Sequence, residues 1–136
     1  MANFVVEKLS GLPPHPAEPF YKLFVEGKCF FDEFCREMTK NGNQRKALEK
    51  IQVIIVEISL GKRVPTKWFQ ELKYRGKDDP YRDYEIRCKQ LRLYLFEDGD
   101  TGKIIVLGEL KKGKSTQNKA IRKMREIKLA YFASKE

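Results

Sequence analysis

The stretch DYEIRCKQLRLYLF, residues 83–96, decides the fold of this chain. Apolar and polar side chains alternate at a spacing of two over residues 83–88 and again over residues 91–96. This is the period of a β-strand, in which successive side chains point to opposite faces. The sequence therefore predicts two adjoining strands. The second has one face of Leu91, Leu93 and Leu95 and another of Arg92, Tyr94 and Phe96.

The segment that follows predicts a hairpin and then a helix. DGDTG, residues 98–102, carries the Gly and Asp residues of a tight turn, and IIVL, residues 104–107, is the next apolar strand. Antiparallel pairing is expected. Ser115 or Thr116 can cap a final helix. Its apolar face is formed at helical spacing by Ala120, Met124, Ile127 and Tyr131.

The first half of the chain predicts a strand and a helical hairpin. Residues 4–9 are rich in apolar and β-branched side chains, and a Pro-rich loop follows over residues 12–20. Apolar side chains then recur with the helical period over residues 30–38 and 47–58. The Ile and Val content of the second segment leaves a strand as its alternative. A short segment around Trp68 is expected to dock on the core.

These elements predict one α+β domain over residues 1–136. It has a small, mainly antiparallel sheet of about four strands, an N-terminal helical hairpin and a basic C-terminal helix. The hydrophobic content of 41% suffices for one modest core. The three cysteines lack CxxC spacing, so we expect no disulfide framework and no metal site. We find no long apolar run and predict a cytoplasmic protein with no membrane partner.

The charge is concentrated in one segment. Lys and Arg total 28 against 19 Asp and Glu, for a net charge of +9. Over residues 111–128 only Glu126 opposes eight cationic residues, which are Lys111, Lys112, Lys114, Lys119, Arg122, Lys123, Arg125 and Lys128. One face of the final helix is therefore expected to be cationic and to favour anionic partners.

A formal nucleotide-binding motif overlaps this segment. GELKKGKS, residues 108–115, fits the phosphate-cradling pattern GxxxxGK[ST] and lies between a strand and a helix. Such a loop belongs to a parallel βαβ sheet, whereas the preceding strand here belongs to a hairpin and only one helix follows. We therefore expect no nucleotide cofactor.

A second group of cations is better placed for chemistry. Arg87 and Arg92 lie near the junction of their strands, and antiparallel geometry can bring them close to the lysines that leave the third strand. Arginine offers a planar fork to phosphate oxygens and lysine a movable charge, so the group can bind an RNA backbone. The alternative is a solvated charged surface. Tyr84, Tyr94 and Trp68 can stack on bases or fill the core.

The residues from Pro65 to Tyr131 also match a known family in order and spacing. The matching blocks are PTKWFQELK at 65–73, YEIR at 84–87, LRLY at 91–94, IIVL at 104–107, KK at 111–112 and the final helix. In these blocks the chain resembles the RelE and HigB toxins, including phage-derived relatives. The first strand and the two helices fit the family's remaining elements, while the Pro-rich insertion is unusual.

The resemblance implies a toxin of a toxin-antitoxin pair that cleaves messenger RNA in the ribosomal A site. Members of the family activate the ribose 2′-hydroxyl to attack the adjacent phosphate, without a metal or another cofactor. Arg92 falls on the arginine that contacts the scissile phosphate, and Arg87 on the one that closes the second strand. We predict a catalytic group of Arg87, Arg92, Lys112 and Glu85. RNA contacts are expected from Lys111, Lys114, Lys119, Arg122 and Tyr94.

The chain departs from the family pattern in its proton-transfer residues. Asn118 stands where the RelE branch places a tyrosine, and Asp83 and Glu85 stand where it has lysines. The single histidine, His15, lies in the Pro-rich loop. An amide cannot accept a proton near neutral pH. Glu85 or a lysine with a lowered pKa is a candidate base, although Glu85 can instead orient Arg87.

Two functions follow as hypotheses. The first is a ribosome-dependent endoribonuclease whose partners are messenger RNA and a cognate antitoxin protein. The second is a noncatalytic RelE-like module that binds nucleic acid or a protein, because the tyrosine is missing.

Overall fold

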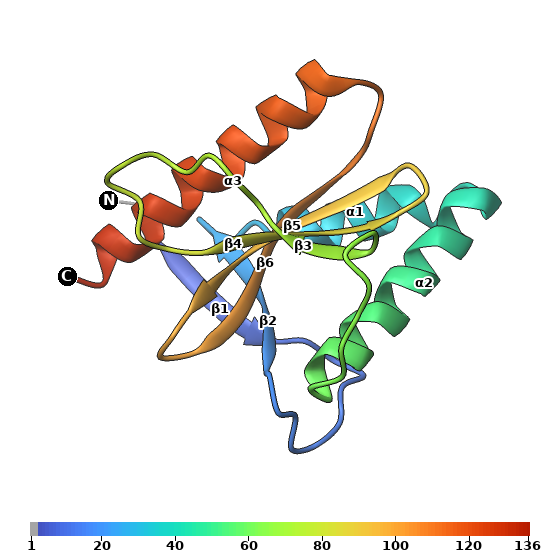
Figure 1. Cartoon of the computed structure of the whole chain (residues 1–136), viewed down its shortest axis with the longest axis horizontal. Coiled ribbons are helices and arrows are strands. Elements are labelled where there is room, and N and C mark those ends of the chain that lie inside the picture. The colour runs from blue at the N-terminus through green and yellow to red at the C-terminus, as the bar shows by residue number, and fades with distance from the viewer. Residues whose placement is uncertain (1–2) are drawn as a thin grey trace.

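The computed structural model describes residues 3–136 as a mixed sheet with helices on both faces (Figure 1). The sheet holds six strands in the order β1-β2-β6-β5-β4-β3, and every neighbouring pair is antiparallel except β2 and β6, which are parallel. The strands are β1 (Phe4–Lys8), β2 (Phe20–Val25), β3 (Phe69–Glu71), β4 (Asp83–Cys88), β5 (Leu91–Asp98) and β6 (Gly102–Leu110). The helices are α1 (Phe30–Met38), α2 (Gly42–Ser59) and α3 (Lys114–Ser134).

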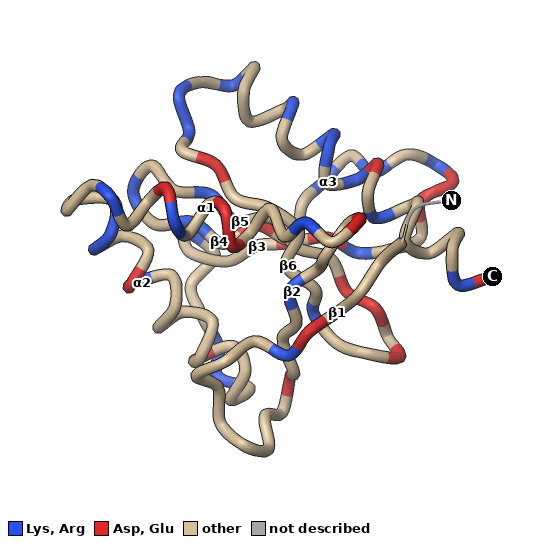
Figure 2. The backbone as a smooth tube through the Cα atoms, turned by 180° about the vertical axis from the view of Figure 1, so that it is seen from behind, with Lys and Arg blue, Asp and Glu red and all other residues tan. Residues whose placement is uncertain are grey.

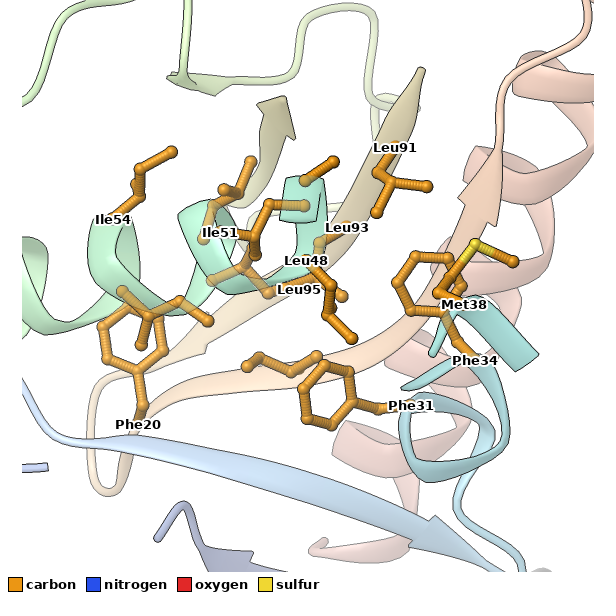
Figure 3. Close-up of a cluster of buried hydrophobic side chains, with 14 of the residues drawn as sticks. Phe20, Phe31, Phe34, Met38, Leu48, Ile51, Ile54, Leu91, Leu93 and Leu95 are labelled. Atoms are coloured by element: carbon orange, nitrogen blue, oxygen red, sulfur yellow. The ribbon is translucent and has the colours of Figure 1, made fainter. Parts of the chain in front are cut away.

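The sheet separates two hydrophobic clusters. On one face, α1 and α2 cover side chains that include Leu91, Leu93 and Leu95 of β5, and Figure 3 shows Phe31, Phe34 and Met38 of α1 among them. On the other face, α3 covers Tyr94 and Phe96 of the same strand. All residues from Leu91 to Phe96 are buried. The alternation in β5 therefore separates two cores, and not a core from solvent.

The helical hairpin is confirmed, and local chemistry explains its second helix. The Asn41 side chain accepts hydrogen bonds from the backbone N–H groups of Asn43 and Gln44, so it caps the start of α2. The apolar stripe that includes Ile51, Ile54 and Ile58 is buried. The strand alternative for this segment is wrong, because burial of the stripe outweighs the low helix propensity of isoleucine and valine.

The expectation of about four strands was wrong, because β2 and β3 are additional. Strand β2 begins directly after the Pro-rich segment, and its partner β6 lies far along the chain, with Tyr21 opposite Ile104. Strand β3 has only three residues, and its strand form depends on pairing with β4, where Phe69 lies opposite Ile86. Neither pairing leaves a local periodic signal in the sequence.

A buried ion network fixes α3 on the sheet. Asp83 of β4 is fully buried; Arg125 contacts both of its carboxylate oxygens at 2.9 and 3.1 Å, and Lys128 Nζ lies 2.7 Å from Oδ2. Lys128 also pairs with buried Asp79 at 2.8 Å. Arg125 and Lys128 thus face inward. They do not extend the cationic surface that the sequence predicted for this helix.

The far end of α3 is tied to the turn between β5 and β6. Tyr131 donates a hydrogen bond to buried Asp98 at 2.7 Å, and Lys135 Nζ lies 2.6 Å from the same oxygen. Together with the network at Asp83, this contact sets the direction of the helix. The first turns of the helix therefore lie over β4, where Gln117 contacts Glu85. No helix within residues 3–136 is both long and apolar enough to cross a membrane.

Candidate functional site

The register of the three central strands gathers polar side chains on the α3 face of the sheet. Arg92 of β5 lies opposite Arg87 of β4 on one side and opposite Glu109 of β6 on the other. Glu85 lies opposite Tyr94, and this pair is two residues along the strands from the pair of Arg87 and Arg92. Because alternate residues of a strand share a face, all five side chains point toward the start of α3. The structure thus brings Arg87, Arg92, Glu85 and Tyr94 together, and it adds Glu109.

Glu85 is a buried carboxylate between two arginines. Its Oε2 accepts a hydrogen bond from Gln117 of α3 at 2.9 Å. Its Oε1 lies 3.3 Å from Arg87 Nε and 4.0 Å from Arg92 Nε. Among the described residues, none of these three buried atoms makes an aligned hydrogen bond. Buried polar atoms are normally satisfied, so the contact keeps unused hydrogen-bonding capacity.

The two arginines are placed differently. Arg92 is only 8% exposed, and its Nη1 donates to the carbonyl oxygens of Lys89 and Leu91 at 2.7 and 2.9 Å. It therefore closes the turn between β4 and β5, where Lys89 has a φ of 55°. Arg87 is 34% exposed and binds no backbone carbonyl among the described residues. Arg87 is thus the arginine that a ligand reaches more easily.

Tyr94 and Glu109 form a second polar pair beside Arg92. Tyr94 is fully buried, and its hydroxyl donates to Glu109 Oε2 at 2.7 Å. Burial raises the pKa of Tyr94 far above its usual value, so this residue remains a neutral donor. Burial, supported by the charge of Glu85, also raises the pKa of Glu109, although the bond from Tyr94 and the charges of Arg92 and Lys111 oppose that change.

Glu109 was missed by the sequence interpretation. It occupies a variable position of the GxxxxGK[ST] pattern. The signal that would have found it is the register of the hairpin, which places it across from Arg92. Tyr94 was expected on the RNA surface, but in this structure its ring lies in the core, because α3 covers that face of β5.

Most of the lysines and arginines around the site are exposed. Figure 2 shows Lys and Arg positions recurring along the segment that leads into α3 and along the helix itself. Lys111 is half-buried and continues the ladder past β6, since its backbone N–H donates to the Gln90 carbonyl at 2.7 Å. Within residues 3–136 none of the exposed members forms an ion pair. These members are Lys112, Lys114, Lys119, Arg122 and Lys123.

The GxxxxGK[ST] pattern does not form one continuous loop. Residues 108–110 belong to β6, and Gly108 pairs with Leu93 of β5. A Cβ atom on Gly108 would lie 2.5 Å from the ring of Phe34 in α1. Close packing of a helix on the sheet therefore explains this glycine. The loop proper is limited to the residues between Leu110 and Lys114.

The remaining candidates lie outside the cluster. Asn118 is exposed on α3 and lines a groove beside β3, while its neighbour Gln117 reaches Glu85. His15 is exposed in the Pro-rich loop. Tyr84 stacks on Phe69 with ring centroids 5.2 Å apart.

The chemistry of the site has to be interpreted from its own residues, because comparisons with known proteins find no match. Within residues 3–136 no group of three His, Cys, Asp or Glu side chains is arranged to hold a metal ion. The arrangement offers two arginines, a fringe of lysines and two carboxylates of different burial. No family model, no curated protein and no solved structure matches this chain.

Proposed function

We propose that this chain is a RelE-type endoribonuclease that cleaves messenger RNA on the ribosome and acts as the toxin of a toxin-antitoxin pair. The observation that carries the proposal is the arginine pair Arg87 and Arg92, held by buried Glu85 beneath the cationic start of α3. The resemblance of the sequence to the RelE and HigB toxins supports the same assignment.

In this proposal Arg87 acts on the scissile phosphate. Arg87 contacts its oxygens and stabilises the charge that develops as the ribose 2′-oxygen attacks phosphorus. Glu85 and Arg92 lie beside Arg87 but do not reach the substrate, because their side chains are nearly inaccessible. Lys112 and Lys114, with Lys119 and Arg122 further along α3, bind the phosphates on either side. The products are a 2′,3′-cyclic phosphate and a free 5′-hydroxyl.

The test is cleavage of messenger RNA on translating ribosomes, together with growth arrest on expression in bacteria. Arg87→Ala is expected to lower the cleavage rate by about 100-fold, the usual loss for one charge-stabilising donor. Arg63→Ala is the matched control, because Arg63 is exposed in the loop before β3. A folded Arg87→Ala protein that cleaves like the wild type would contradict the proposal.

A second function is favoured by a specific observation. Tyr94 is buried, Asn118 stands where the RelE branch has tyrosine, and these positions provide no exposed phenol at the site. A noncatalytic module that binds RNA through its exposed cations fits this arrangement. Its affinity would fall steeply with salt, since phosphate neutralisation releases counterions. RNA binding of that kind without any cleavage on translating ribosomes would select this function.

A further inference from the structure

Cleavage through the 2′-hydroxyl requires a group that accepts its proton. Two carboxylates lie beside the arginines, and their surroundings differ. Glu85 is 2% exposed, its Oε2 is bonded to Gln117, and its Oε1 faces the two arginines. A substrate hydroxyl has little access to it. The geometry makes Glu85 the shared ionic neighbour of Arg87 and Arg92.

Glu109 is both held and accessible. Tyr94 fixes its Oε2, and among the described residues no hydrogen bond engages its Oε1. Its side chain is half-buried and lines an open groove of about 520 Å³ between α1 and α3, together with Phe34 and Leu107. Arg92 lies directly across the strand pair from it. A carboxylate with one fixed and one free oxygen, beside the pair of Arg87 and Arg92, has the geometry of a general base.

We propose that Glu109 is the general base of the cleavage reaction, an inference that rests on the proposed function. Its Oε1 takes the proton of the ribose 2′-hydroxyl while the 2′-oxygen forms a bond to phosphorus. The bond from phosphorus to the 5′-oxygen breaks, and the leaving oxygen takes a proton from water. Glu109 then returns its proton to the solvent, so the reaction is balanced without another reactant. Tyr94 acts as a positioning residue.

The charges that face Glu109 set the pH at which it works. Arg92 from β5 and Lys111 after β6 favour its ionised form, as does the hydrogen bond from Tyr94. Burial and the charge of Glu85 from β4 favour the protonated form. The groove is also lined by Lys123 of α3 and by Glu33 and Glu37 of α1. Because the pKa of Glu109 is raised, its carboxylate is a stronger proton acceptor than an ordinary glutamate.

The experiment measures single-turnover cleavage on translating ribosomes from pH 5 to 8, together with RNA affinity, for the wild type and Glu109→Gln. We expect the variant to bind RNA as before and to cleave at least about 100-fold more slowly, with no loss of rate on the acid side. Tyr94→Phe removes a bond that lowers the pKa of Glu109, so its acid limb should move to higher pH. A purely structural role would not produce that shift.

The outcomes separate the two proposals. If the wild type cleaves and a folded Glu109→Gln protein keeps its rate and its acid limb, Glu109 is not the base and the proposed function stands. If the wild type does not cleave, both proposals fall. Should Glu109→Gln fail to fold, Glu109→Asp is tested instead. This variant keeps the charge, but its shorter side chain moves the carboxylate oxygens away from the substrate hydroxyl. It should cleave slowly and retain the acid limb, and full activity would overturn the inference.

Discussion

Strand β4 carries two buried carboxylates, Asp83 and Glu85, that use the same kind of partners in different ways. Each lies against two cationic side chains on the α3 face. Around Asp83 the hydrogen bonds are aligned, with both oxygens engaged by Arg125 and one also by Lys128. Around Glu85 the oxygen that faces the arginines makes no aligned hydrogen bond with them. The polar atoms of the Asp83 cluster therefore satisfy one another's hydrogen bonds. The Glu85 cluster keeps unused hydrogen-bonding capacity that a ligand can engage.

Because of this difference, we expect Asp83 to contribute to stability and Glu85 to function, although the two residues lie two positions apart in one strand. A buried charge is tolerated when its partners satisfy it, and removing one partner leaves the others unpaired in a medium of low polarity. The cluster at Asp83 should therefore determine how firmly α3 is attached. The cluster at Glu85 should affect binding and catalysis more than the free energy of unfolding.

The largest effect is expected for Asp83→Ala. The substitution leaves fully buried Lys128 with Asp79 as its only carboxylate partner among the described residues. It also removes both carboxylate contacts of Arg125. We expect the free energy of unfolding to fall by about 3–5 kcal/mol, the usual loss when a buried ion pair is broken. Urea denaturation monitored by circular dichroism measures this. Lys119→Ala on the exposed face of α3 serves as control, and a loss below about 1 kcal/mol for Asp83→Ala would contradict the comparison.

An intermediate effect is expected for Arg92→Ala. Arg92 binds two carbonyl oxygens of the turn and faces Glu85, so its removal unpairs acceptors and a buried charge. A loss of about 1–3 kcal/mol in the free energy of unfolding is expected. Arg87→Ala in the same denaturation experiment should lose less than about 1 kcal/mol, because the side chain is partly exposed. Equal losses for the two arginines would remove the distinction between them.

A smaller change in stability is expected for Glu85→Gln. The amide oxygen can still accept from Gln117, and the oxygen that faces the arginines has no aligned bond to lose. The free energy of unfolding should change by less than about 1 kcal/mol. RNA affinity at low salt should increase, since the arginines lose a negative neighbour. Filter binding over a salt series measures this, and weaker binding by a stable variant would show that Glu85 assists the ligand directly.

The smallest effect is the pH dependence of the contact at the far end of α3. Burial alone would raise the pKa of Asp98, but hydrogen bonds from Lys135, Tyr131 and the backbone of Asp100 lower it below its usual value. The stabilisation is therefore present above the unfolded pKa and is lost as pH falls through the folded pKa. Denaturation at pH 7 and at pH 3 should show Asp98→Asn less stable than the wild type at pH 7, with the difference shrinking at pH 3. A constant difference would contradict this assignment.

Sequence patterns predicted the elements whose signal is local. Residues 83–88, 91–96 and 104–107 alternate because each strand is long enough to show its period, and the three helices have apolar stripes. The patterns did not predict β2, which pairs with a distant parallel strand, or the short β3. The position of α3 above the sheet depends on Asp83, whose cationic partners lie more than 40 residues away.

The candidate site was predicted in the same uneven way. Arg87 and Arg92 could be placed together because they flank one tight turn. The burial of Tyr94 could not be predicted from the alternation. Its position faces solvent in an ordinary surface strand, but here it lies under α3. Charge alone also could not distinguish inward-facing Arg125 from exposed Lys119. Predicting that Glu109 belongs to the site requires the pairing register of β5 and β6. That register includes a bulge next to Tyr94.

The parallel pairing of β2 with β6 has a consequence for folding kinetics. Most of the chain lies between the two strands in the sequence. Pairing them therefore costs the conformational entropy of closing a long loop. Proteins dominated by such contacts fold slowly. During synthesis the residues of β2 leave the ribosome well before those of β6, and the hairpin of β1 and β2 must wait with one edge unpaired. The arginine site, which needs β6 and α3, therefore assembles only after both of these elements have been synthesised.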